Sequence, residues 1–389
     1  MNEWTKAEKT GIAKIKVVGV GGGGNNTVHS MIKEKIEGVE FIVANTDQQV
    51  LNSSTAHVVL PLGLSAKGLG AGADPEIGRK AALEVEESIK QQLVHTDMVI
   101  IAAGMGGGTG TGAAPEIARI AKEQGALVVG VVTTPFNFEG TKRNENAKIG
   151  LEGMDEHTDS LIVISNEKLL EQFGGISLKD SFIYADKTLK QTIRTITDLI
   201  AIPALINLDF ADVTTVMKNK GRALIGIGRA TGEDRATKAA IHAISSPILE
   251  ASISGAKNAI INISGGDITL DEANTAVEAI KQAANENLNI IFGVAINDAL
   301  EKDIQISVIA TGVSDEVKKL TPQELKEEIS KAVETIDVDF ENEKTREILL
   351  KDVLPEDEKL TITDEMDLQA TTPFDIDEDE DDLPEFLRR

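Results

Sequence analysis

Short apolar runs alternate with helical patterns over the first part of the chain, and this alternation most strongly limits the folds open to it. Strand-like runs rich in β-branched residues lie at residues 14–20, 39–44, 57–60, 98–103, 127–132 and 161–165. Stretches with helical periodicity lie between them, at residues 25–36, 75–93 and 113–123. Strands that alternate with helices form an open parallel sheet covered by helices on both faces. An α/β domain is therefore expected over residues 12–175.

The second part of the chain begins with a long helical pattern. Apolar residues recur at steps of three and four from Phe182 to Ile200, and Pro203 ends the pattern. One helix with a single apolar stripe is therefore expected over residues 176–202. Strand-like runs follow at residues 223–227, 259–264, 290–296 and 304–310, separated by helical stretches at 235–244 and 270–284. These predict a second α/β domain over residues 203–313.

The charge of the chain is acidic and unevenly distributed. Its formal net charge is -25, and residues 337–389 contain 20 acidic and 6 basic residues. Residues 337–382 lack apolar periodicity and repel one another, which predicts a disordered acidic linker. The last seven residues, Leu383–Arg389, combine apolar side chains with two arginines. This composition is typical of a docking peptide, and an ordinary frayed terminus is the alternative interpretation. A flexible arm is expected over residues 1–11, and a capping box at Thr321–Glu324 predicts an amphipathic helix over 314–336.

Composition excludes several classes of function. A chain this acidic repels the phosphate backbone, and aromatic residues make up only 3%, so nucleic-acid binding is not expected. Cysteine is absent, which excludes disulfides and thiolate sites and fits a reducing cytoplasm. The longest apolar run, residues 98–103, is too short to insert into a membrane. The five histidines show no pair at ligand spacing, so no metal site built from protein side chains is expected.

A first glycine loop, Gly19–Gly24, lies between a strand and a helix. It matches the GxGxxG pattern of dinucleotide-binding folds, and Asp47 follows the second strand near the place of a ribose-binding acid. A Rossmann oxidoreductase that binds NAD(P) is one interpretation of this segment, and a simple tight turn is another. Asn25 and Asn26 open the helix and offer amides to a base or a ribose.

A second and stronger motif is the run GMGGGTGTG at residues 104–112, which joins another strand to the next helix. Six glycines exceed what a turn requires, whereas backbone N–H groups at a helix N-terminus suit a polyphosphate. The Gly-Lys-Ser/Thr of a Walker loop is absent. Phosphate charge would thus be met by backbone dipoles and by Mg²⁺, held mainly by phosphate oxygens and water. With a third glycine loop at residues 68–74, the sequence favours a nucleoside triphosphate.

Asp209 and Asp212 form a pair of carboxylates three residues apart, beyond Pro203. One interpretation is that Asp212 caps the helix that follows. The other is that both carboxylates orient a water for attack on a γ-phosphate, because positioning and electrostatics carry most of phosphoryl transfer. Phe182 also has two interpretations, as a core residue of the apolar stripe or as a platform for a base.

Five segments together resemble those of one family. They are GGGGNN, GLGAGADPE, GMGGGTGTGAAPEIA, PFNFEGTKR and NLDFADV. In this order and spacing they are similar to the FtsZ family of bacterial tubulin-like cell-division GTPases. The resemblance covers about residues 14–313, and residues 383–389 resemble that family's tail peptide. It implies an α/β fold with a Rossmann-like tubulin/FtsZ GTPase domain, a central helix, and a second α/β domain with the GTPase-activating loop and polymer interface.

The resemblance also implies roles for individual residues. In the three loops, GTP or GDP would be bound by Gly21, Gly22, Asn25, Asn26, Gly70, Ala71, Gly72, Ala73, Gly107, Gly108, Thr109, Gly110 and Thr111. Residues 70–73 among them would sense the γ-phosphate. Glu139 and Arg143 would hold the ribose and guanine side, while Phe182 and Asp186 would stack on and hydrogen-bond guanine. The implied catalytic residues are Asn207, Asp209 and Asp212, which would reach the nucleotide of the next subunit.

The implied function is a GTPase that polymerises head to tail into filaments of the division ring, in the cytoplasm at mid-cell. Its partners would be further copies of itself and, through Leu383–Arg389, membrane-tethered division adaptors and regulators. Two other classes of protein stay open. An NAD(P)-dependent oxidoreductase leaves the second glycine loop and the acidic loop without a role, and a non-hydrolysing tubulin-like scaffold has no need of Asp209 and Asp212.

Overall fold

The structure is a computed structural model, and it describes residues 13–313 except 37, 64–67, 173–176, 202–204, 207, 247–248, 250–252, 254 and 285–287. Four expected segments lie outside the described residues: the N-terminal arm, the helix over 314–336, the acidic linker and the docking peptide. Asn207 also lies outside them.

One sheet of ten strands runs through the described part of the chain, in the order β3-β2-β1-β4-β5-β6-β7-β10-β8-β9. The strands are β1 (Ile15–Val20), β2 (Val39–Asn45), β3 (Val58–Pro61), β4 (Met98–Gly104), β5 (Leu127–Thr134), β6 (Ser160–Ser165), β7 (Gly221–Ala230), β8 (Asn258–Gly265), β9 (Asn289–Ile296) and β10 (Ile304–Thr311). Strands β1 to β6 are all parallel, and their order is that of a dinucleotide-binding sheet. β7 joins β6 in parallel through three residue pairs, and β10 runs antiparallel between β7 and β8.

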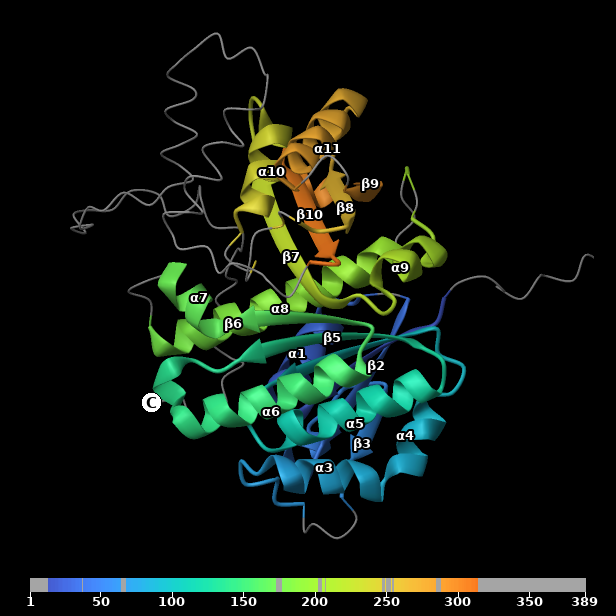
Figure 1. Cartoon of the computed structure of the whole chain (residues 1–389), viewed down its shortest axis with the longest axis vertical. Coiled ribbons are helices and arrows are strands. Elements are labelled where there is room, and N and C mark those ends of the chain that lie inside the picture. The colour runs from blue at the N-terminus through green and yellow to red at the C-terminus, as the bar shows by residue number, and fades with distance from the viewer. Residues whose placement is uncertain are drawn as a thin grey trace, which may run out of the picture. The chain divides into compact units, whose positions relative to one another are not determined.

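Helices cover both faces of the parallel part of the sheet (Figure 1). They are α1 (Gly21–Lys33), α2 (Gln48–Asn52), α3 (Pro75–Glu84), α4 (Glu86–Leu93), α5 (Thr109–Glu123), α6 (Thr141–His157), α7 (Asn166–Gln172), α8 (Leu178–Ala201), α9 (Phe210–Met217), α10 (Arg235–Ile244) and α11 (Leu270–Ala284). Alternate strand residues face opposite layers. Val17 packs in a core with α1 and α8, whereas its neighbour Val18 packs in a core with α3 to α6. The sheet is therefore buried on both faces, as its continuous apolar strands require.

The long helix α8 connects the two parts of the sheet. Its apolar stripe, which includes Leu189, Ile193 and Ile196, is buried in the same core as Ala223 and Ile225 of β7. A third core lies under α10 and α11, where alanines of both helices pack on β8 and β10. The sheet thus continues across the boundary that the sequence predicts near residue 203.

Most expected elements are confirmed, and three differ in their bounds. The single helix expected over residues 75–93 is two helices, α3 and α4, because Val85 between them has a non-helical backbone (φ −117°, ψ 22°). α1 and α5 begin four residues earlier than the apolar periodicity indicates, at Gly21 and Thr109, because their glycine-rich segments already form the first turn. α6 was not expected, since its pattern is mostly polar.

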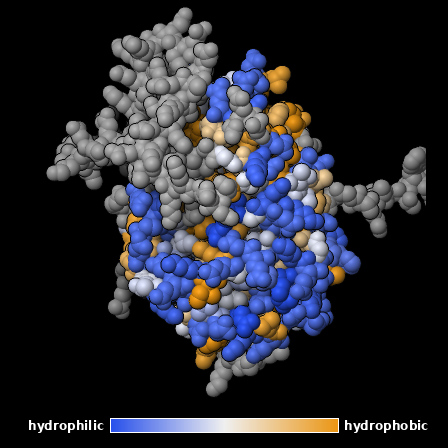
Figure 2. All heavy atoms as spheres, viewed as in Figure 1, coloured by the Kyte–Doolittle hydropathy of each residue, from blue (hydrophilic) through white to orange (hydrophobic). Residues whose placement is uncertain are grey.

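The face of the molecule drawn in Figure 2 is largely polar. Figure 2 shows hydrophilic side chains over most of the described surface on this face, with apolar residues in small scattered patches. Within the described residues, no helix combines the length and the apolar character needed to cross a membrane.

Candidate nucleotide-binding site

The three glycine loops lie together at one edge of the sheet. Because Val20 of β1 pairs with Ala103 of β4, the two strands end side by side and their loops touch. A Cβ placed on Gly21 would lie 2.9 Å from the backbone nitrogen of Gly110, and one placed on Gly108 would lie 2.7 Å from the Cβ of Ala71. These glycines therefore allow the loops to approach one another closely.

Two helix N-termini point their free N–H groups at this edge. Neither α1 nor α5 has a side-chain cap, and neither has an acidic residue in its first turn. In contrast, the side chain of Asp74 caps α3. Uncapped N-termini with a positive dipole end and no competing carboxylate are suited to an anion.

Gly22 and Gly107 lie at positions where neither the backbone conformation nor a close neighbour within the described residues requires glycine. Among the described glycines they are the two that have neither a positive φ nor any atom within 4 Å of an added Cβ. One belongs to the first loop and the other to the second. Glycine at an unstrained and open position permits the close approach of a group from outside the chain, as a phosphate requires.

Side chains fix the loops from within. The hydroxyl of Thr111, which is buried, accepts a hydrogen bond from the Gly106 N–H at 2.8 Å, and Thr109 bonds to Thr46 at 2.6 Å. Asn25 is fully buried. In the orientation that satisfies its neighbours, its amide donates to the carbonyls of Gly19 and Gly21 and accepts from Asn45 Nδ2. Asn25 therefore supports the first loop, while Asn26 is exposed beside it.

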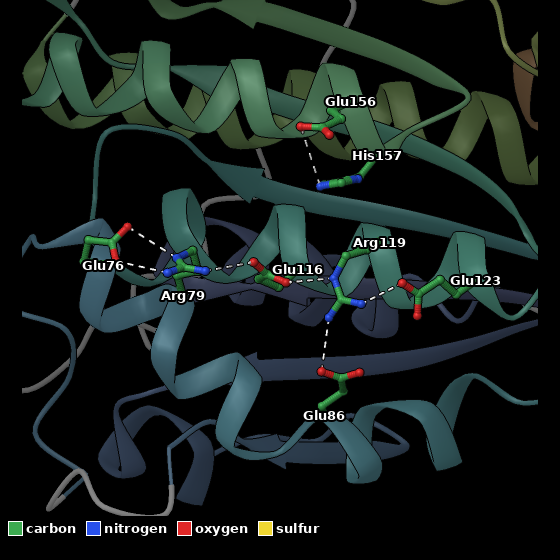
Figure 3. A network of polar contacts seen from close by, with 8 residues as sticks. All are labelled: Glu76, Arg79, Glu86, Glu116, Arg119, Glu123, Glu156 and His157. Carbon is green, nitrogen blue, oxygen red and sulfur yellow. Dashed lines mark hydrogen bonds and ion pairs between the residues drawn. The ribbon is translucent and has the colours of Figure 1, made fainter.

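An ion-pair network fixes α3, and with it the third loop, on α5 (Figure 3). Arg79 lies between Glu76 and Glu116. Arg119 bonds to Glu86, Glu116 and Glu123 at 3.1, 3.0 and 2.7 Å. The helices also touch through their backbones, since a Cβ on Gly112 would lie 1.9 Å from the Pro75 carbonyl oxygen.

The expected base side of the site is built around aromatic rings. Glu139 accepts a hydrogen bond from the Phe136 N–H and forms an ion pair with Arg143 one helical turn later. The ring of Phe182 at the start of α8 lies edge-on to Phe136 and Phe138, with centroids 5.2 and 6.4 Å away. Phe182 is 42% exposed, so it is available as a platform rather than buried in the core. The sequence interpretation did not assign Phe136 or Phe138, although both lie in the segment PFNFEGTKR.

Asp186 lies one turn after Phe182 on the same face of α8. Partial burial of its carboxyl raises the pKa to about 6, because the charged form loses contact with water. A carboxylate held in this state, beside an exposed ring, is a candidate acceptor for the N–H groups of a ligand.

The acidic loop lies at the opposite edge of the sheet. Ser160 Oγ, at the first residue of β6, donates to the Met217 carbonyl at the end of α9, so α9 lies where the parallel strands begin. Figure 1 shows α9 at the far end of α8 from α7, and the 24 residues of α8 span about 36 Å. Asp209 and Asp212 form a reciprocal capping box, in which each side chain accepts a backbone N–H of the other. The capping interpretation is therefore wrong about the residue: Asp209, not Asp212, is the N-cap of α9, and Asp212 completes the box from the third helical position. Asp209 is exposed and Asp212 is half-buried.

Comparison with known proteins identifies the family. The GTPase domain of the Tubulin/FtsZ family matches residues 14–174, and the C-terminal domain of the FtsZ family matches residues 221–314. A cell division protein FtsZ of Mycoplasmopsis pulmonis is 56% identical over 378 residues, which are 97% of each chain. A solved FtsZ dimer of M. jannaschii is 44% identical with a TM-score of 0.77, and the match covers 80% of this chain and 92% of that one. CetZ2 of Haloferax volcanii, at 19% identity and a TM-score of 0.66 over 83% of this chain and 98% of that one, shares the fold. The chain belongs to the FtsZ family of tubulin-like GTPases.

Proposed function

We propose that this protein binds GTP where its three glycine loops meet, and that it assembles head to tail into the filaments of a bacterial division ring. The observation that carries the nucleotide site is the open space at Gly22 and Gly107, between two uncapped helix N-termini. Asp186 beside the exposed ring of Phe182 supports guanine as the base. An NAD(P)-dependent oxidoreductase is inconsistent with membership of a GTPase family.

The GTPase site is proposed to be completed between adjacent subunits. Asp209 and Asp212 lie at the other edge of the sheet from the glycine loops, so a second copy must bring them to the nucleotide. Asn207 is assigned to the same catalytic loop. Head-to-tail contacts join opposite ends of identical subunits and continue into filaments. This arrangement favours a hydrolysing polymer over a non-hydrolysing scaffold.

Mg²⁺ is proposed to accompany the triphosphate. The loops offer backbone N–H groups and the hydroxyls of Thr46 and Thr109, which suit phosphate oxygens and not a dedicated metal cage. The ion would be held mainly by phosphate oxygens and water, and it would neutralise charge that develops on the phosphates.

Substitution of Gly107 tests the nucleotide site. Gly107→Ala adds a methyl group to open space, so the protein should fold normally while its GTP dissociation constant rises at least about tenfold. Gly104→Ala is the matched control, because its methyl would lie 3.6 Å from the Thr133 hydroxyl, in ordinary contact inside the protein. Equilibrium binding and thermal melting of both variants decide the matter. Equal affinities would contradict a phosphate at Gly107.

We assign the chain to the cytoplasm at the mid-cell ring, with residues 12–175 as the GTP-binding domain, 176–202 as the central helix and 203–313 as the second domain. Leu383–Arg389 would bind membrane-tethered division adaptors, with residues 337–382 as a spacer. Removal of these last seven residues should abolish adaptor pull-down and spare GTP hydrolysis. Loss of hydrolysis would contradict this role.

A further inference from the structure

The side chain of Asn146 joins two of the glycine loops. Asn146 lies on α6 and is 1% exposed. Its amide nitrogen donates to the Ala73 carbonyl at 3.0 Å and to the Gly106 carbonyl at 3.3 Å. Both partners are acceptors, so only the amide nitrogen can face them. One buried donor group therefore bridges the third loop and the second.

Both bridged carbonyls belong to residues with an unusual backbone. Ala73 has φ 61° and Gly106 has φ 101°. For alanine this left-handed conformation is disfavoured and persists only when surrounding contacts hold it. Within the loop, Ala71 already packs on Gly108. The Gly70 N–H also donates to the Thr46 carbonyl at 3.2 Å. Asn146 provides a further attachment, at the residue whose backbone conformation is disfavoured.

The helix that carries Asn146 is itself closely packed on the second loop. A Cβ on Gly106 would lie 2.9 Å from the carbonyl oxygen of Arg143, and one on Gly150 would lie 2.8 Å from Thr111 Cγ2. α6 therefore has little freedom to shift relative to residues 104–111. A donor mounted on it fixes the distance between the two loops.

We infer that Asn146 is a positioning residue that sets where residues 70–73 stand over the terminal phosphate, and thereby how well the site distinguishes GTP from GDP. This inference rests on the proposed function, in which those residues sense the γ-phosphate. Asn146 acts through the carbonyl of Ala73 and does not touch the nucleotide. Loss of its donor should weaken GTP binding more than GDP binding.

The test compares dissociation constants for GTP and GDP, measured at protein concentrations too low for assembly. Asn146→Leu removes the donor at similar volume, and Asn146→Asp keeps the shape and removes the donor as long as its carboxyl is ionised. In both variants the dissociation constant for GTP should rise about tenfold, which is the effect of one to two lost hydrogen bonds. The dissociation constant for GDP should rise less than about threefold. Asn146→Gln keeps a donor and should restore most of the preference for GTP. Asn144→Asp is the control for charge, because the Asn144 amide donates to the Gly140 carbonyl at 3.4 Å and, among the described residues, joins neither glycine loop.

The outcomes separate this inference from the proposed function. An unmodified chain that binds no guanine nucleotide would overturn both. An unmodified chain that prefers GTP, with Leu and Asp variants that fold and keep that preference, would overturn the role of Asn146 alone. Equal weakening of GTP binding and GDP binding would also overturn the role of Asn146, because it indicates a purely structural residue. A selective loss for GTP that Gln restores and the Asn144 control lacks supports the inference.

Discussion

Asp186 combines burial with a proposed role in base recognition, and the two have opposite effects on the charge of its carboxyl. Burial raises its pKa to about 6. In the proposed complex, guanine N–H groups donate to the carboxylate and favour its charged form, so binding should lower this pKa. GTP affinity should therefore rise with pH and level off above about pH 6. Equilibrium binding between about pH 5 and about pH 8 measures this, and Asp186→Asn should keep only the pH dependence of the nucleotide phosphates.

The same pKa shift works against the stability of the nucleotide-free chain. A carboxyl with a raised pKa contributes stability that is complete below its unfolded value of 3.8 and is lost as pH rises through about 6. At pH 7, Asp186→Asn should thus raise the free energy of unfolding by about 1 kcal/mol after allowance for solvent screening. Denaturant unfolding without nucleotide tests this. A variant that binds GTP poorly and is also less stable would indicate a structural carboxylate instead.

Some residues of the site follow from the sequence, and others depend on neighbours that it does not reveal. The glycines of the second loop are recognisable because a turn has no use for six of them. Asn25 was expected to offer its amide to a base or ribose, yet its amide is occupied inside the first loop. Asn146 belongs to no motif, because its two partners lie 73 and 40 residues away in the chain. Such roles depend on burial and on contacts between residues that lie far apart in the sequence.

Among the elements, α5 carries an ion-pair network that should contribute measurably to stability. Arg119 bonds to three carboxylates, and one of them, Glu86, lies on α4. Arg119→Met should lower the free energy of unfolding by about 1–2 kcal/mol, and less in high salt, because it leaves those carboxylates to repel one another. Arg222→Met is the matched control, since the bond from Arg222 to Asp155 is a single ion pair at 2.6 Å. Equal effects of the two changes in denaturant unfolding would show that the network adds nothing.

The sequence predicts elements well where apolar periodicity is strong. The helices α10 and α11 have the bounds that their periodicity indicates. Apolar periodicity does not predict α6, because this helix buries only a few residues, namely Asn146, Ala147, Gly150 and Met154. The break at Val85 involves neither glycine nor proline, and nothing in the sequence marks it. Local patterns thus give the presence of an element more reliably than its ends.

At the scale of the whole molecule, strand pairing is the feature that the sequence leaves open. Two α/β patterns are consistent with two separate sheets. The structure instead joins them through three residue pairs between β6 and β7. Pairing is a long-range property, and patterns within a strand do not encode its neighbour. This continuity, together with α8, holds the glycine loops and the acidic loop at opposite edges of one continuous sheet.

Separation of the two half-sites predicts that hydrolysis needs contact between subunits. Asp212→Asn keeps an oxygen that can accept the Asp209 N–H, so α9 should stay capped. It removes the charge, and GTP turnover should fall about a hundredfold or more while GTP binding is retained. Asp271→Asn, an exposed first-turn carboxylate of α11, is the control and should retain turnover. Turnover per subunit should also rise steeply with protein concentration.

A mixture of two inactive variants gives the sharpest test of this geometry. Gly107→Val should block the nucleotide and leave the acidic loop intact, whereas Asp212→Asn keeps the nucleotide and lacks the charge. Alone, each should be nearly inactive. In an equal mixture, half of the subunits hold nucleotide and half of their neighbours supply Asp212, so up to about a quarter of the unmodified rate should return. If both half-sites served the same subunit, the mixture would hydrolyse no more GTP than the sum of its parts, and the shared site would be wrong.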